Sequence, residues 1–132
     1  MGVKRSLINR RYAWLTMVYC VIIFALSSIG RVPEALRWIT AYDLAIHAVV
    51  YAGLGWLAGM TVRKGAEPWR GWRLWAAPIA FVAVYGASDE IHQFFVPGRY
   101  CALADWIADV AGAATVQMVF VLKNRCRVKD GS

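Results

Sequence analysis

Four long runs of apolar residues alternate with short polar segments along the chain. The runs cover residues 12–28, 44–62, 74–95 and 102–122. Each approaches the roughly 20 residues with which a helix crosses the apolar core of a bilayer. The last two runs reach that length only if they include acidic residues, which are Asp89, Glu90, Asp105 and Asp109. The pattern predicts an all-α bundle of four transmembrane helices, forming a single domain over residues 1–132.

The polar segments between the runs contain residues that end helices. Gly30 and Pro33 follow the first run, Pro68 follows the second, and Pro97 with Gly98 follows the third. The first run has an alternative interpretation, because basic residues precede it and residues 25–27 resemble a signal-peptide cleavage site. We expect a membrane span here instead, since the run is long for a signal peptide and three more apolar runs follow.

Composition agrees with a membrane environment. The chain is 60% hydrophobic and 17% charged, whereas soluble domains are roughly 45–50% apolar and about 25% charged. A domain of 132 residues has too small an interior to bury that excess. The net charge of +7 would suggest nucleic-acid binding in a soluble protein, but no supporting motif occurs, and we predict no nucleic-acid partner.

The basic residues are concentrated in alternate polar segments. Those before the first run, between the second and third runs, and after the fourth run are Lys4, Arg5, Arg10, Arg11, Arg63, Lys64, Arg70, Arg73, Lys123, Arg125, Arg127 and Lys129. The remaining segments hold only Arg31, Arg37 and Arg99. The positive-inside rule therefore predicts that both termini, with the basic segments 1–11 and 123–132, lie in the cytoplasm.

The other polar residues gather at the opposite, extracytoplasmic end of the predicted bundle. They are Asp43, His47, Asp89, Glu90, His92, Gln93, Arg99, Asp105 and Asp109. A carboxylate within a membrane segment costs roughly 2.5–3.5 kcal/mol, so such groups need partners. Helical spacing places Asp43, His47 and Tyr51 on one face, and Asp105, Asp109 and Gly112 on another. We expect Asp89 to be exposed at the membrane interface, and Gly112 to permit close helix packing.

Three stretches resemble the signatures of the VanZ-like family of small multi-pass membrane proteins. The first has Asp43, His47, Tyr51 and Leu54, the second is residues 88–99, and the third has Asp105, Asp109 and Gly112. The chain departs from the family pattern twice. Leu44 stands where a Lys is frequent, and Asp109 stands where Asn is usual. The resemblance covers about residues 43–112 and implies a location in the bacterial inner membrane, with a role in resistance to teicoplanin-type antibiotics.

The polar cluster is compatible with two kinds of function. As a binding site, it would take a lipid head group, a cell-envelope precursor or a glycopeptide antibiotic, through Arg99, Gln93, Asp43, Tyr51 and His92. As a lipid-phosphate hydrolase or transferase, it would use Glu90, Asp105 and His47 in catalysis, with His92 as an alternative base. In that case Asp105, Asp109 and Glu90 would bind Mg²⁺ or another divalent cation.

A purely structural role is the third alternative. Arg99 would then pair with Glu90 or Asp105, and His47 would hydrogen-bond to Asp109, so that the polar groups fix the register of the helices. The predicted partners are the bilayer and a lipid-linked or amphiphilic small molecule. Four short helices enclose little volume, which leaves a homodimer open, and nothing in the sequence fixes the oligomeric state.

Overall fold

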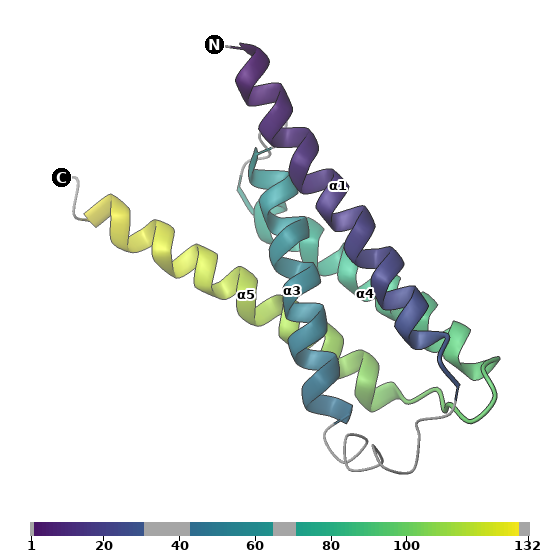
Figure 1. Ribbon diagram of the computed structural model, residues 1–132. Coiled ribbons are helices and arrows are strands. Elements are labelled where there is room, and N and C mark those ends of the chain that lie inside the picture. The colour runs from purple at the N-terminus through teal and green to yellow at the C-terminus, as the bar shows by residue number, and fades with distance from the viewer. Residues whose placement is uncertain (1, 31–42, 65–70, 130–132) are drawn as a thin grey trace.

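The residues that the computed structural model describes form four long helices (Figure 1). The helices are α1 (Gly2–Ser27), α3 (Asp43–Lys64), α4 (Arg73–Phe94) and α5 (Leu103–Lys129). The structure describes residues 2–30, 43–64 and 71–129, and side chains within 10–30, 43–64 and 71–124. These residues contain no strand, which confirms the predicted all-α class. Arg31 and Arg37 lie outside them.

Three of the helices are long and apolar enough to cross a membrane. The candidate spans are Arg10–Ser27, Asp43–Lys64 and Leu103–Asn124. Helix α4 has 22 residues, a sufficient length, but Asp89 and Glu90 in its last turns lower its hydropathy. The fourth span and the cytoplasmic location of the termini therefore stay predictions.

The two terminal helices extend beyond the apolar runs that predicted them. Helix α1 begins at Gly2 rather than near residue 12, and α5 continues to Lys129 rather than ending near residue 122. Both extensions are rich in Lys and Arg, which are good helix formers, and no proline interrupts either one. Hydrophobicity marks the part of a helix that fits the bilayer core, whereas helix propensity allows the helix to continue beyond that part.

Helix α3 occupies the centre of the bundle. It packs most extensively against α5 and also contacts α1 and α4, while α4 packs against α5. In Figure 1 the start of α1 and the end of α5 lie at one end of the bundle, and the end of α1 and the turn after α4 lie at the other. The end of α1, the start of α3, the end of α4 and the start of α5 therefore meet. This meeting point is where the sequence places its acidic residues.

Small residues bring α3 and α5 into backbone contact. A Cβ atom at Gly112 would collide with the carbonyl oxygen of Ala48. A Cβ atom at Gly55 would lie 2.8 Å from the Cα atom of Ala113. The close approach is possible because neither position carries a side chain. It fixes the distance between the polar residues of α3 and those of α5.

Candidate functional site

Buried polar side chains from three helices converge at this end of the bundle. They are His47 and Tyr51 of α3, Asp89, Glu90 and Gln93 of α4, and Asp105 and Asp109 of α5. Within each helix most of these residues are spaced by four positions, so they occupy one face. The same side chains are the ones that the sequence predicts to lie at one depth.

His47 and Asp109 form a buried polar pair of the site. The Nδ1 atom of His47 lies 2.9 Å from Oδ1 of Asp109, and the two side chains are 9% and 0% exposed. The other carboxylate oxygen of Asp109, Oδ2, has no hydrogen-bond partner among the described residues. It lies over Gly86 of α4, where an added Cβ atom would approach it to 2.9 Å. The missing side chain at Gly86 therefore makes room for this carboxylate.

Asp89 is a buried member of the site. The Tyr51 hydroxyl and the Gln93 amide each donate a hydrogen bond to its Oδ2 atom, both at 3.0 Å. The residue is only 4% exposed, and its Oδ1 atom has no partner among the described residues. The expectation of an exposed Asp89 is wrong, because the last turns of α4 face α3 and α1. The spacing of four between Asp89 and Gln93 is the sequence signal that indicates this shared face.

Glu90 joins the end of α4 to the start of α5. Its Oε2 atom accepts a hydrogen bond of 2.8 Å from the backbone N–H of Ala102, just before α5 begins. Backbone N–H groups at a helix start lack partners within the helix and favour a carboxylate. The second oxygen, Oε1, is buried without a partner in the described part of the chain.

A tight turn after α4 directs Arg99 back toward the bundle. The N–H of Arg99 donates a 3.1 Å hydrogen bond to the carbonyl of Val96. Between them lie Pro97 and Gly98, the latter with a φ angle of +86°. Proline at the second position and a positive-φ glycine at the third are typical of a type II turn. The sequence therefore encodes the local geometry that positions this arginine.

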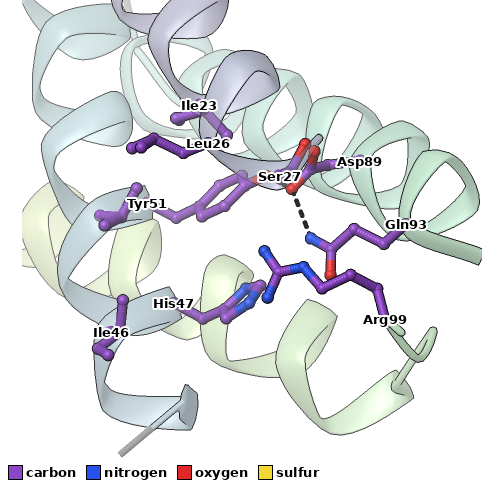
Figure 2. A pocket seen from close by; sticks show the side chains of 10 residues that line it. Ile23, Leu26, Ser27, Ile46, His47, Tyr51, Asp89, Gln93 and Arg99 are labelled. Carbon is purple, nitrogen blue, oxygen red and sulfur yellow. Dashed lines mark hydrogen bonds between the residues drawn. The ribbon is translucent and has the colours of Figure 1, made fainter. Parts of the chain in front are cut away.

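The Arg99 guanidinium is unpaired within the described residues. It donates no hydrogen bond to any of them, and its Nε atom is buried without a partner. The predicted ion pair with Glu90 or Asp105 does not form between these described side chains. Figure 2 shows the Arg99 side chain extending from the turn past Gln93 toward His47. The backbone of the turn therefore directs the cation toward the cavity, where no described side chain pairs with it.

A cavity of about 100 Å³ lies in front of this arginine (Figure 2). Its lining consists of Ile23, Leu26, Ser27, Ile46, His47, Val50, Tyr51, Asp89, Gln93 and Arg99. The apolar side chains come from α1 and α3, and most of the polar ones come from α3, α4 and the turn. The cavity thus has a polar side with one cation and an apolar side of aliphatic chains.

The predicted metal ligands fall into two groups that share His47. One group contains His47, Glu90 and Asp109, and the other contains Asp43, His47 and Asp105. In each group, one ligand atom per residue lies within 4.8 Å of the others. The predicted set of Glu90, Asp105 and Asp109 does not form one group by this criterion. His47 therefore lies near Glu90 and Asp109. It also lies near Asp43 and Asp105, which belong to the first turns of α3 and α5.

His92 lies apart from the cavity lining. Its Nε2 atom is 3.0 Å from the hydroxyl of Ser28, and its ring centroid is 4.5 Å from that of Phe24. Both partners belong to the end of α1 or follow it directly. His92 therefore joins α4 to α1 on the outer side of the site.

Comparison with known proteins identifies the family. The family model described as VanZ/LLP1 matches residues 12–124. No curated protein and no solved structure matches the chain. The matched region runs from α1 to α5 and contains every residue of the site, including the stretches on which the resemblance was noted. The chain belongs to the VanZ/LLP1 family.

Proposed function

We propose that the protein binds the phosphate-bearing head group of a membrane amphiphile, either a lipid or a lipid-linked cell-envelope precursor. The observation that carries this proposal is the unpaired guanidinium of Arg99 at the cavity. A guanidinium offers a planar fork of donors that matches phosphate oxygens. The Nε atom of Arg99 is buried without a partner among the described residues, so it loses hydration without gaining a hydrogen bond, which is costly. A bound phosphate would supply that partner.

The two sides of the cavity suit the two parts of such a ligand. Ile23, Leu26 and Ile46 supply an apolar wall for the glycerol region and first methylene groups. Asp89 contributes an oxygen without a partner, Oδ1, on the polar side. That oxygen can accept a hydrogen bond from a hydroxyl or ammonium group attached to the phosphate.

The cavity volume favours a small head group over an entire antibiotic. Pockets for drug-sized ligands hold roughly 300–1,000 Å³, whereas this cavity holds about 100 Å³. A phosphate with a small substituent fits, and the rest of the amphiphile would lie in the bilayer. Resistance to a teicoplanin-type antibiotic would then arise through an envelope lipid rather than through capture of the drug.

We place the site in the outer leaflet of the bacterial inner membrane. The support is the distribution of Lys and Arg, which are dense at the opposite end of the bundle. Reporter fusions within residues 65–70 and within residues 96–100 test this location. We expect a cytoplasmic signal from the first position and an extracytoplasmic signal from the second, and the reverse result would place the site on the cytoplasmic side.

Binding can be measured by native mass spectrometry of the detergent-purified chain. The probes are phosphatidylglycerol, phosphatidylethanolamine and diacylglycerol, the last of which lacks phosphate. We expect retention of the phospholipids and loss of diacylglycerol. Arg99→Gln should weaken phospholipid retention by about tenfold or more, because a hydrogen bond to a charged group contributes about 1.5–3 kcal/mol.

Arg73→Gln is the matched control, since Arg73 is an exposed arginine at the other end of the bundle. It removes the same charge and should leave phospholipid retention unchanged. Equal retention of diacylglycerol and phospholipid would contradict the proposal, as would an Arg99→Gln variant that binds like the unmodified chain. Inorganic phosphate, added as a competitor, distinguishes a lipid head group from free phosphate as the ligand.

A second candidate function is hydrolysis or transfer at the bound phosphate. The observation that favours it is the His47–Asp109 pair, because a carboxylate that holds one imidazole nitrogen leaves the other able to accept a proton. Phosphate release from a panel of lipid phosphates, with and without divalent cations, tests it. Turnover that His47→Asn abolishes would support catalysis, and an absence of turnover across the panel would leave binding as the function.

A further inference from the structure

Two buried carboxylates of the site have an oxygen with no hydrogen-bond partner in the described part of the chain. These oxygens are Oε1 of Glu90 and Oδ2 of Asp109. The two residues are only 4% and 0% exposed, so bulk water does not solvate them. A buried anionic oxygen without a partner is strongly unfavourable unless a cation or a proton neutralises it. Glu90 and Asp109 come from α4 and α5, and one carboxylate oxygen of each lies within 4.8 Å of the other.

His47 completes a set of three ligands around this region. One nitrogen of His47 and one carboxylate oxygen each from Glu90 and Asp109 lie within 4.8 Å of one another. All three side chains are buried, and they come from three different helices. We propose that His47, Glu90 and Asp109 bind one divalent transition-metal ion.

The unpaired oxygens distinguish this group from the neighbouring one. Asp43, His47 and Asp105 satisfy the same distance criterion. Asp43 is partly exposed, however, and neither Asp43 nor Asp105 has a buried oxygen without a partner among the described side chains. Water can solvate those carboxylates, whereas Oε1 of Glu90 and Oδ2 of Asp109 are buried and have no partner among the described residues.

The ligand atoms indicate the class of ion. Mg²⁺ and Ca²⁺ prefer oxygen ligands alone, whereas imidazole favours Zn²⁺ and other late transition metals. One imidazole with two carboxylates therefore favours an ion of the Zn²⁺ type. Zinc binds nitrogen and oxygen at about 2.0–2.2 Å, so the three ligand atoms would shift to reach that distance from one ion. The His47–Asp109 hydrogen bond would be exchanged for bonds to the ion.

Three protein ligands leave a fourth position around a tetrahedral ion, as in catalytic zinc sites. Because His47 lines the cavity, that position would be accessible from the head-group side. The ion would also reduce the negative charge that surrounds Arg99 and a bound phosphate. The metal site does not depend on the head-group proposal, since Arg99 is not one of its ligands.

The experiment measures metal binding by the purified chain in detergent. The protein is prepared without a polyhistidine tag and with Cys20, Cys101 and Cys126 replaced by serine, so that neither tag nor thiols bind the ion. After chelation, Zn²⁺ stoichiometry and affinity are measured by titration. Co²⁺ absorption then reports the geometry of the site. We expect one ion per chain, with the spectrum of a nitrogen- and oxygen-liganded site, and no displacement by millimolar Mg²⁺.

The variants Glu90→Gln and Asp109→Asn remove a charged ligand with little change of shape. The new amide oxygens can still accept the hydrogen bonds from Ala102 and His47. Each variant should lower Zn²⁺ affinity by more than about tenfold, since loss of an outer-shell partner alone costs about 10–100-fold. His92→Asn, a histidine outside both groups, and Arg99→Gln should bind Zn²⁺ like the parent chain.

The outcomes separate this proposal from the previous one. Zn²⁺ binding that Glu90→Gln and Asp109→Asn weaken, without any phospholipid retention, supports the metal site and removes the head-group function. Phospholipid retention without Zn²⁺ binding overturns the metal site alone. The metal site is also overturned if both variants bind Zn²⁺ like the parent chain, or if Mg²⁺ competes on equal terms. Size-exclusion profiles and melting curves of each variant confirm that it is folded.

Discussion

The partners of buried polar groups differ between the two ends of the α3–α5 contact. At the basic end, the Nη1 atom of Arg63 donates to Oε1 of Gln117 at 2.9 Å and to the carbonyl of Gly59 at 3.0 Å. The Gln117 amide in turn donates to the carbonyl of Gly55 at 2.8 Å. The Arg63 guanidinium also lies 4.1 Å from the ring centroid of Phe120. The chain itself thus supplies partners for the Nη1 atom and for the face of this guanidinium, whereas its Nε atom is buried without a partner among the described residues.

At the acidic end, Asp89, Glu90 and Asp109 each keep an oxygen without a partner in the described residues, and Arg99 donates no hydrogen bond to them. More of the buried polar groups therefore have partners within the chain at the basic end than at the acidic end, which agrees with the proposed ligand binding at the acidic end. Cavity volume alone would instead favour the basic end as the place for a ligand. A groove of about 430 Å³ lies between α4 and α5 nearer the basic end, but apart from Gln117 its lining is mainly apolar.

The largest effect on stability is expected at Gly112, because the acidic and the basic end of the bundle both depend on the α3–α5 contact. Gly112→Val would place a side chain against the carbonyl oxygen of Ala48, and a helix backbone cannot give way as a flexible side chain does. We expect a loss of about 3 kcal/mol in the free energy of unfolding, measured by titration with sodium dodecyl sulfate. Lipid retention and Zn²⁺ binding should be lost together.

Ala111→Val is the matched control, because Ala111 is exposed on the same helix. Its free energy of unfolding should stay within about 0.5 kcal/mol of the parent value. If Gly112→Val were as stable as this control, the close approach of α3 and α5 would not be the contact that holds the two ends in place.

An intermediate effect should separate the two partly buried arginines, Arg63 and Arg99. Arg63→Gln removes donors to Gln117 and Gly59, so the free energy of unfolding should fall by about 1–3 kcal/mol. Arg99→Gln removes no hydrogen bond to a described residue, so stability should change by less than about 0.5 kcal/mol. Phospholipid retention should instead fall more in Arg99→Gln than in Arg63→Gln. A large loss of stability in Arg99→Gln would instead favour the structural alternative.

The smallest effect is expected inside the cavity. Tyr51→Phe removes one of the two donors to Oδ2 of Asp89, which should lower the free energy of unfolding by about 0.5–1.5 kcal/mol. Tyr12→Phe is the control, since the Tyr12 hydroxyl makes no hydrogen bond among the described residues and its ring packs edge-on against Trp56. Equal stability of the two variants would mean that water replaces the Tyr51 hydroxyl without cost.

The helices were predictable because their signals are local. The run 44–62 predicted α3 (Asp43–Lys64), and the run 74–95 predicted α4 (Arg73–Phe94), each within two residues at both ends. Arg99 was recognisable from the Pro97 and Gly98 turn. Asp89 was misplaced, because its depth depends on how α4 rotates against α3. The role of Gly86 had no sequence signal either, since it depends on a carboxylate 23 positions further along the chain, at Asp109.

The sequence by itself determined which residues reach one end of the bundle, because helix length and turn positions fix the depth of each side chain along its own helix. It also determined the excess of carboxylates at that end. Only the tertiary structure decided how these groups pair, since pairing depends on the rotation and separation of the helices. It joined His47 to Asp109 and Tyr51 to Asp89, and it left the guanidinium of Arg99, Oε1 of Glu90 and Oδ2 of Asp109 without hydrogen-bond partners in the described chain.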